Sequence, residues 1–342
     1  MIHIVAESHI PYLHGVLEPW ARVTYSPVID AKTAHDADVL LVRTRTRCDA
    51  ALLNGSHVRF IGTATIGTDH IDMDYCRQHG ITVANAPGCN APAVAQWVLT
   101  ALGRWMHLRN EQDASHLTLG VVGVGHVGSI VARWARQLGF NVLLNDPPRA
   151  MRSPDEAELF TPLAQLAARC HIITFHTPLT SSGPHATRHL CDTQLLSAAN
   201  KCRLIVNAAR GGIADDQALA QWHGDVAIDC WENEPQLNPA LLHKAMVATP
   251  HIAGYSAQGK ARATAMLLQA LNAHFGWQVP VPVIDAPTAG AEHVTLDGIM
   301  ATYDIMADTA ALQAQPASFE ILRNTYHLRS EVCDLFQPTD SK

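Results

Sequence analysis

The chain has 342 residues, of which 48% are hydrophobic and 16% charged, a balance that predicts about two globular domains with substantial cores. Its net charge is −7, with 24 basic against 31 acidic residues, so no basic surface for nucleic acid is expected. No apolar run reaches the roughly 18 residues that would span a bilayer, and the N-terminus lacks the features of a signal peptide. We therefore expect a cytoplasmic protein without membrane partners.

The eight cysteines are scattered along the chain, and none of them forms a CxxC pair. Zinc ribbons and redox dithiols need closely spaced cysteines, so neither kind of site is expected. The 20 histidines include no HExxH motif. We expect reduced, buried thiols and no metal site.

Four apolar runs of strand length occur in the first third of the chain, at 2–6, 38–42, 58–64 and 81–86. Their hydrophobicity is continuous rather than alternating, which is typical of parallel strands covered on both faces. A long helical pattern over 91–108 follows, with a proline near its start, where a missing N–H costs little. This first third is therefore predicted to form an α/β unit of its own.

Six further runs of strand length, separated by helical stretches, follow that helix. They span 118–125, 141–146, 171–176, 203–209, 225–231 and 246–251. Strands that alternate with helices imply right-handed crossovers and a doubly wound parallel sheet. A helical pattern over 256–277 and a proline-rich break over 279–290 come next, and the tail contains helix-like segments such as 318–336.

A glycine-rich turn joins the first strand of this second series to a helix. Gly123, Gly125 and Gly128 have the spacing GxGxxG, which permits a tight turn and close approach of the backbone to a pyrophosphate. The N-terminus of the following helix would then bind the phosphates. Asp146 ends the next strand and is expected to bind the adenosine ribose hydroxyls, which favours NAD over NADP. Arg149, three residues later, leaves the 2′-phosphate alternative open.

Three later strands end in residues suited to carboxylate binding and acid–base chemistry. Arg210 follows one strand, the acidic residues Asp229, Glu232 and Glu234 follow the next, and His251 follows the third. Because the carboxyl ends of parallel strands meet at one edge, we expect these side chains in one crevice. A histidine with a carboxylate partner can take a hydroxyl proton, and a guanidinium can hold a carboxylate through two parallel bonds. Taken singly, Arg210 and His251 could equally be ordinary residues of glycine-containing loops.

The ordered motifs GxGxxG…Asp, TFHTPLT, NAARGG, DCWENEP and TPHIAGY resemble the D-2-hydroxyacid dehydrogenase family. The resemblance implies an α/β fold in which a Rossmann dinucleotide-binding domain is inserted in a split flavodoxin-like substrate domain. It places the substrate domain at 1–92 and 256–280 and the NAD-binding domain at 93–255. A small C-terminal dimerisation region is implied at 281–342.

The same resemblance implies the roles of individual residues. The catalytic residues would be Arg210, Glu234 and His251. The cofactor contacts would be Gly123, Gly125, Gly128, Asp146, Thr177, Ala208, Asp229 and Gly254. The substrate contacts would be Thr44, Thr65 and Tyr255.

More specific motifs are similar to one branch of the family, which acts on a phosphorylated 2-hydroxy acid in vitamin B6 synthesis. They are VRTRT, FIGTATIGTDHID, APGCNA, DPPRA, TFHTPLTSSGP, HIAGYSAQGKAR and the tail segments YDIMADTAAL and FEILRNTYHLRSE. This implies a homodimer that oxidises 4-phospho-D-erythronate to 2-oxo-3-hydroxy-4-phosphobutanoate with NAD. The sequence departs from the family at Gln96, where glutamate is usual, and at Ala209, where the branch that it resembles has cysteine.

The run from Arg43 to Arg47 offers clustered donors for a doubly charged phosphate at one strand end. In an extended segment its three arginines point to one side and its two threonines to the other, so not all of them can contact the phosphate. A solvated basic edge is the alternative interpretation of the run.

Two other functions stay open at this point. A sister dehydrogenase acting on 3-phosphoglycerate, glyoxylate or an unphosphorylated 2-hydroxy acid would share these motifs. An NAD-sensing protein without catalysis would share the fold, although Arg210, Glu234 and His251 together favour an enzyme. The physiological electron acceptor is not predicted by the sequence.

Overall fold

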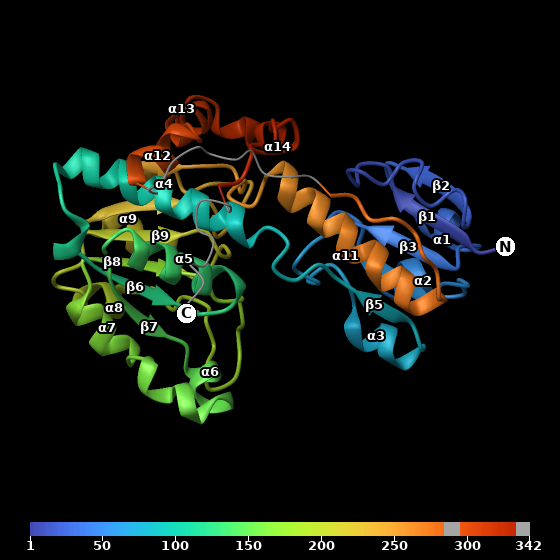
Figure 1. Cartoon of the computed structure of the whole chain (residues 1–342), viewed down its shortest axis with the longest axis horizontal. Coiled ribbons are helices and arrows are strands. Elements are labelled where there is room, and N and C mark those ends of the chain that lie inside the picture. The colour runs from blue at the N-terminus through green and yellow to red at the C-terminus, as the bar shows by residue number, and fades with distance from the viewer. Residues whose placement is uncertain (284–294, 333–342) are drawn as a thin grey trace, which may run out of the picture. The chain divides into compact units, whose positions relative to one another are not determined.

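The computed structural model describes residues 1–283 and 295–332 of the chain (Figure 1). The chain forms two compact units, one made of 1–90 and 256–285 and the other of 91–255 and 286–342. The described part of the C-terminal region therefore belongs to the second unit. Within the described residues, no helix is both long and apolar enough to cross a bilayer.

The first unit is built on a five-stranded parallel sheet. In spatial order its strands are β2 (Arg22–Ser26), β1 (His3–Glu7), β3 (Val39–Val42), β4 (Phe60–Thr63) and β5 (Thr82–Ala84). Four of these strands coincide with the predicted apolar runs. The edge strand β2 was not predicted, because its sequence RVTYS is only half-buried and contains no apolar run.

Helices cover both faces of this first sheet. The short helices α1 (Ala31–Ala34), α2 (Ala50–Leu53) and α3 (Met73–Gln78) share one apolar core with the strands. The long helix α11 (Ala257–Phe275) packs on the other face, drawn in orange in Figure 1. Ser256 caps its N-terminus and Gly276 ends it at φ 69°, as the predicted helix required.

The second unit contains a six-stranded parallel sheet. In spatial order its strands are β7 (Asn141–Asn145), β6 (Thr118–Val122), β8 (Ile172–Phe175), β9 (Leu204–Asn207), β10 (Asp225–Ile228) and β11 (Val247–Ala248). All six lie within predicted runs. The winding reverses at β6, from which the chain passes to β7 on one side and later to β8 on the other, and such switch points bind ligands in open α/β sheets.

Two apolar cores flank this second sheet. Helices α4 (Ala91–Arg109) and α5 (His126–Gln137) belong to one core. Helices α7 (Leu163–Arg169), α8 (Thr193–Ala198), α9 (Asp216–Gln221) and α10 (Pro239–Lys244) belong to the other. The remaining short elements are η1 (Ala114–His116), α6 (Pro147–Arg152) and η2 (Pro154–Leu159). The fold is thus the doubly wound α/β arrangement that the sequence predicts.

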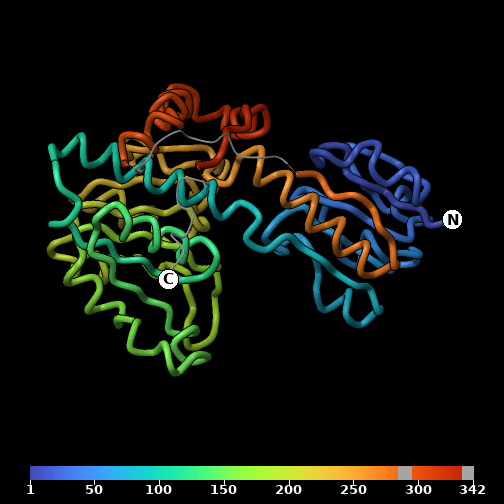
Figure 2. Tube along the Cα trace, in the orientation of Figure 1, coloured from blue at the N-terminus to red at the C-terminus, as the bar shows by residue number. Residues whose placement is uncertain are grey.

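The C-terminal region packs along α4 and beside the edge strand β11 (Figure 2). It contains α12 (Leu296–Ala301), α13 (Ile305–Ala314), η3 (Pro316–Ser318) and α14 (Phe319–Asn324). The Oγ1 atom of Thr309 accepts a hydrogen bond from the amide of Ala248 at 3.2 Å, which ties α13 to β11.

The helical pattern predicted over 318–336 was wrong in its extent. The helix ends at Asn324, and the residues described beyond it, 325–332, are not helical. The segment turns inward so that the buried guanidinium of Arg329 binds backbone carbonyls, which a surface helix would not allow. The part of the prediction beyond 332 lies outside the described residues.

Candidate active site

His251 and Glu234 form the centre of a polar cluster at the carboxyl ends of β9, β10 and β11. The Nδ1 atom of His251 lies 2.5 Å from Oε1 of Glu234, and both side chains are about one-quarter exposed. The second carboxylate oxygen of Glu234 accepts from the amide of Trp231 at 3.3 Å. Donation from Nδ1–H to a carboxylate leaves Nε2 as the basic nitrogen of the neutral ring.

Glu234 stays ionised in this arrangement. Burial alone would raise the pKa of its carboxyl group, but the hydrogen bond and charge of His251 lower it, and so do the charge of Arg323 and the amide of Trp231. The net pKa lies below the ordinary value for glutamate. A charged carboxylate next to the ring stabilises the imidazolium that forms when His251 takes up a proton.

Asp229 fixes the loop that carries His251. Its carboxylate accepts from Oγ1 of Thr249 at 2.6 Å, from the amide of Ile252 at 2.8 Å and from the amide of Ala253 at 3.0 Å. Asp229 is only 1% exposed. These bonds offset the strain of His251, whose φ of 57° lies in the left-handed region and costs a non-glycine residue about 1–2 kcal/mol.

Arg329 holds the same loop from the C-terminal region, and the sequence analysis did not identify it. Its guanidinium donates to the carbonyls of Ile252 at 3.0 Å, Tyr255 at 3.1 Å and Ala93 at 3.0 Å, and also to that of Ala253. It lies 4.5 Å from the ring centre of Tyr303. A buried arginine with four carbonyl partners has no signature in the sequence, because its partners are distant along the chain.

The other acidic residues of the β10 loop have different partners. Glu232 contacts Nε2 of His189 at 2.7 Å and Arg188 at 3.1 Å, and its amide donates to Asp216 at 3.2 Å. Burial is the main cause that raises the pKa of Asp216 to about 6. Of the three acidic residues predicted at this strand end, Glu234 alone contacts the His251 ring with its carboxylate among the described contacts, whereas Asp229 accepts from the His251 amide through its backbone carbonyl.

The loop of Arg210 rests on the loop that carries Glu234. A Cβ atom added to Gly211 would lie 1.9 Å from the carbonyl oxygen of Trp231, so only glycine allows this contact. The carbonyl of Arg210 accepts from the side-chain amide of Asn207 at 3.0 Å, and its Nη1 donates to the carbonyl of Ala209 at 2.8 Å. These bonds fix Arg210 next to the carboxylate-bearing loop.

The charges around Cys230 show how closely these groups are gathered. Burial raises the pKa of its thiol well above the ordinary value, and the negative charges of Asp229 and Glu234 raise it further. The positive charges of Arg210 and Arg323 oppose that effect. Two guanidinium groups and the Glu234 carboxylate therefore all lie within electrostatic range of this buried thiol.

The glycine-rich turn has the shape that a dinucleotide pyrophosphate requires. Gly123 has a φ of 86°, and a Cβ on Gly128 would lie 1.9 Å from the carbonyl oxygen of Gly123. Gly125 caps α5 without a side-chain hydrogen bond, and the position where its Cβ would stand is open space. Beside this turn the hydroxyl of Thr177 is buried and has no hydrogen-bond partner in the described parts of the chain. An orphaned hydroxyl and an open helix N-terminus fit a bound nucleotide.

Asp146 and Arg149, at the end of β7, lie next to the glycine-rich turn. The carboxylate of Asp146 accepts from the amides of Val124 at 2.8 Å and Arg149 at 2.9 Å. The guanidinium of Arg149 is bound to Glu156 at 2.9 Å and to the carbonyl of Val124 at 2.8 Å. Because Glu156 neutralises Arg149, the arrangement suits a free ribose hydroxyl better than a 2′-phosphate.

The basic run of the first unit does not have the extended form that we predicted. Residues 43–46 form a turn in which the amide of Thr46 donates to the carbonyl of Arg43 at 3.3 Å. The carboxylate of Glu7 stabilises the turn by accepting from the amide of Arg43 at 2.9 Å and from the hydroxyl of Thr46 at 3.3 Å. The predicted alternation of arginine and threonine sides is therefore wrong, and Thr44 lies exposed in the turn.

Thr65 follows β4 in the first unit and is half-buried. Its hydroxyl contacts Oγ1 of Thr63 at 2.6 Å and donates to the carbonyl of Gly67 at 3.0 Å. Thr44 and Thr65 thus follow the carboxyl ends of the neighbouring strands β3 and β4. The residues Ala208, Gly254 and Tyr255 belong to the second unit, where they follow β9 and β11.

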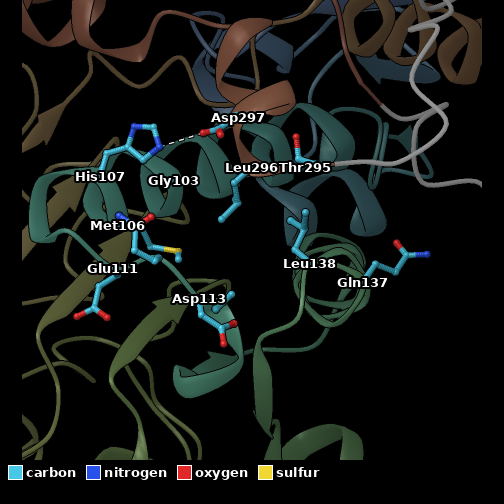
Figure 3. A pocket seen from close by; sticks show the side chains of 12 residues that line it. Gly103, Met106, His107, Glu111, Asp113, Gln137, Leu138, Thr295, Leu296 and Asp297 are labelled. Atoms are coloured by element: carbon cyan, nitrogen blue, oxygen red, sulfur yellow. Dashed lines mark ion pairs between the residues drawn. The ribbon is translucent and has the colours of Figure 1, made fainter.

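A surface pocket of about 400 Å³ lies elsewhere in the second unit, among α4, η1, α5 and α12 (Figure 3). Across it, Nε2 of His107 pairs with a carboxylate oxygen of Asp297 at 2.9 Å. None of its lining residues is a predicted site residue. Strand ends and side-chain chemistry locate the active site better than pocket size does. Nowhere in the described chain do three histidine, cysteine or acidic side chains group as a metal ion requires.

Comparisons with known proteins show the family of the chain. Residues 90–253 match the D-isomer specific 2-hydroxyacid dehydrogenase NAD binding domain. The erythronate-4-phosphate dehydrogenase of Porphyromonas gingivalis is 43% identical over 94% of this chain and 92% of its own. That of Bacteroides fragilis is 43% identical over 96% of this chain and 97% of its own. The fold matches a D-lactate dehydrogenase of Aquifex aeolicus in complex with NAD and lactic acid, with a TM-score of 0.64, 21% identity, and coverage of 80% of this chain and 95% of that one.

Proposed function

The chain belongs to the D-isomer specific 2-hydroxyacid dehydrogenase family, and on that basis we propose that it oxidises 4-phospho-D-erythronate with NAD in vitamin B6 synthesis. The product is 2-oxo-3-hydroxy-4-phosphobutanoate. Full-length relatives that carry the name erythronate-4-phosphate dehydrogenase support this substrate. The observation that carries the proposal is the 2.5 Å contact between His251 and Glu234 at the strand ends of an NAD-binding fold.

His251 acts as the base in the proposed reaction. Its Nε2 atom removes the proton of the 2-hydroxyl group, and the O–H electron pair becomes the second bond of the new carbonyl. Glu234 holds Nδ1–H and stabilises the imidazolium. Bound NAD supplies the acceptor for the hydride that leaves carbon 2. The four carbonyl bonds of Arg329 and the carboxylate of Asp229 keep the His251 loop in position during this transfer.

Arg210 binds the carboxylate of the substrate in this proposal. A guanidinium suits a planar carboxylate because two parallel hydrogen bonds fix its orientation as well as its position. Thr44, Thr65 and Tyr255 are proposed as further substrate contacts, on the basis of the family resemblance. The first two follow strand ends of the first unit, and Tyr255 follows the His251 loop in the second.

The cofactor contacts are proposed along the switch point of the second sheet. They are Gly123, Gly125, Gly128, Asp146, Thr177, Ala208, Asp229 and Gly254. The open N-terminus of α5 would hold the pyrophosphate, Asp146 the ribose, and the buried hydroxyl of Thr177 would gain a partner. Asp229 would act through the loop that it fixes, since its carboxylate already accepts from the Thr249 hydroxyl, from two loop amides and from the Cys230 thiol.

We further propose that the protein is a cytoplasmic homodimer. The family resemblance of the C-terminal region supports dimerisation. Met306 on α13 and Ile321 on α14 are exposed apolar side chains of that region, 38% and 64% exposed respectively, and are accessible to a second copy of the chain.

A substrate panel tests the proposed function. The purified enzyme is assayed with NAD on 4-phospho-D-erythronate, 3-phosphoglycerate, glycolate and D-lactate, with and without an added 2-oxo acid as a recycling acceptor. We expect kcat/KM for 4-phospho-D-erythronate to exceed the others by about 100-fold or more. Faster oxidation of 3-phosphoglycerate or D-lactate would make the protein a sister dehydrogenase. No turnover on any acid, with NAD still bound, would indicate an NAD-sensing protein.

A further inference from the structure

We propose that Arg323, on α14 of the C-terminal region, binds the phosphate group of the substrate together with the hydroxyl of Tyr255. This inference rests on the proposed function, because it assigns the second anionic group of the same substrate. Arg323 lies in the tail motif FEILRNTYHLRSE, for which the family resemblance implied dimerisation and no substrate contact. The C-terminal region would then contribute directly to substrate choice.

The position of Arg323 carries the inference. Its Nε atom donates to the hydroxyl of Tyr255 at 3.3 Å, and Tyr255 follows His251 by four residues. The ring of Tyr255 meets that of Tyr326 edge-on, with centroids 6.2 Å apart, so the tail orients both members of the pair. The side chain of Arg323 is 20% exposed, which leaves part of the guanidinium accessible to a ligand.

The charge of Arg323 acts within the active site. Its positive charge lowers the pKa of Glu234 and opposes the raised pKa of the Cys230 thiol, as that of Arg210 also does. Arg323 therefore lies within electrostatic range of the His251–Glu234 pair. The site contains two guanidinium groups, one from the β9 loop and one from the tail.

Burial disfavours the charged form of Arg323, but Tyr255, Glu234 and Glu320 together raise its pKa, and none of the described contacts is a short bond to a carboxylate. Its Nη1 atom lies 3.7 Å from Glu320, whose side chain is 46% exposed, and such a pair adds little stability. A tyrosine hydroxyl is a neutral acceptor. A phosphate dianion offers charged oxygens with the geometry of a guanidinium fork and is a much stronger partner.

The proposed substrate needs two cationic contacts at separate points. Its carboxylate and its phosphate lie at opposite ends of a four-carbon chain, and Arg210 is proposed to bind the first. In the first unit, Arg47 is already paired with Asp49 at 2.8 Å and Arg43 donates to the carbonyl of His9 at 3.2 Å. Two arginines of the predicted basic cluster thus have protein partners, which favours a phosphate contact from Arg323.

Paired substrates test the inference. Wild type, Arg323→Met and Arg323→Lys are assayed on 4-phospho-D-erythronate and on unphosphorylated D-erythronate. We expect Arg323→Met to raise KM for the phosphorylated acid about 50-fold, with KM for D-erythronate changed less than about threefold. Arg323→Lys should restore part of the loss, because it keeps the charge without the fork. Equal effects on both acids, or no effect on either, would overturn the inference.

Two controls separate this result from misfolding and from failure of the proposed function. Arg169→Met removes an exposed arginine from the end of α7 and should leave both KM values unchanged. Melting temperatures within about 3 °C of wild type establish that the variants are folded. If wild type does not oxidise 4-phospho-D-erythronate, the proposed function is wrong, and inorganic phosphate becomes the probe. Phosphate should then raise the melting temperature of wild type more than that of Arg323→Met, and equal shifts would contradict the inference.

Discussion

His251 and His189 each contact a glutamate of the same loop, Glu234 in the first case and Glu232 in the second. The first contact joins Nδ1 to its carboxylate at 2.5 Å, whereas the second joins Nε2 at 2.7 Å. Both histidines have a positive φ, 57° for His251 and 51° for His189. The partners lie 17 and 43 residues apart along the chain, but residue type and backbone conformation do not separate the two pairs.

The surroundings of the two glutamates separate them. Arg188 also contacts Glu232, so a permanent positive charge compensates that carboxylate whatever the protonation of His189. Glu234 stays ionised and has the amide of Trp231 and the ring of His251 as its bonded partners, while the charge of Arg323 acts on it without a direct contact among the described residues. The comparison teaches that a proton-transfer pair differs from a structural ion pair in what else binds the carboxylate.

The largest effect should follow removal of the two histidines in turn. His251→Gln removes the base, so we expect kcat to fall about 1,000-fold or more while the Kd for NADH stays close to wild type. His189→Gln should keep kcat within about threefold, because its ring has no part in proton transfer. Steady-state rates and a fluorescence titration with NADH measure both quantities. A similar loss of kcat in the two variants would contradict the assignment of proton transfer to the His251–Glu234 pair alone.

A smaller effect should follow removal of the clamp on the His251 loop. Arg329→Met leaves buried carbonyls without a donor, so we expect the free energy of unfolding to fall by about 2–4 kcal/mol. Turnover should fall about tenfold as the loop loosens. Urea unfolding and kcat measure the two effects. Arg169→Met serves as the matched control, and unchanged stability in Arg329→Met would contradict the role of the clamp.

The smallest effect concerns the Asp216 carboxyl group beside the His189–Glu232 pair. Its pKa is raised to about 6, mainly by burial, so the folded state binds a proton more tightly than the unfolded state. The stability that this proton provides is complete below about pH 4 and is lost as the pH rises through 6. Asp216→Asn should therefore stabilise the protein by about 1 kcal/mol at pH 7.5 and have little effect at pH 4. Stabilisation of equal size at both pH values would exclude this explanation.

Continuous apolar runs and glycine turns were sufficient to predict most of the fold. All six strands of the second sheet and the helices at 91–109 and 257–275 coincide with predicted segments, since buried parallel strands leave a strong apolar signal. The edge strand β2 and the turn at 43–46 have no such apolar signal in the sequence. Polar, half-exposed strands lack the apolar run, and the turn depends on the distant carboxylate of Glu7.

Candidate site residues were predictable only where the motifs follow neighbouring strands, as they do after β10 and β11. The contact of Glu234 with His251 agrees with the prediction from the motifs. Arg323 and Arg329 bind partners more than 65 residues away along the chain, so their positions depend on tertiary packing. Gln96 illustrates the same limit. Its amide donates to Oγ1 of Thr302 at 3.0 Å and to the carbonyl of Ser330 at 3.2 Å. The glutamate that is usual in the family only accepts hydrogen bonds when it is ionised, so it could not donate to these two acceptors. Glutamine at position 96 therefore suits the contacts with the C-terminal region of this chain.

The central claim is that His251 transfers the proton with Glu234 as its charged partner. The most direct measurement is the pH profile of kcat/KM for wild type, Glu234→Gln and Glu232→Gln. Because the pKa of Glu234 is held below its ordinary value, its carboxylate remains charged as the pH falls and favours the imidazolium. We predict that Glu234→Gln moves the acid limb to lower pH by about one unit and that Glu232→Gln leaves it in place. An acid limb that stays unchanged in Glu234→Gln, or moves equally in both variants, would contradict the account.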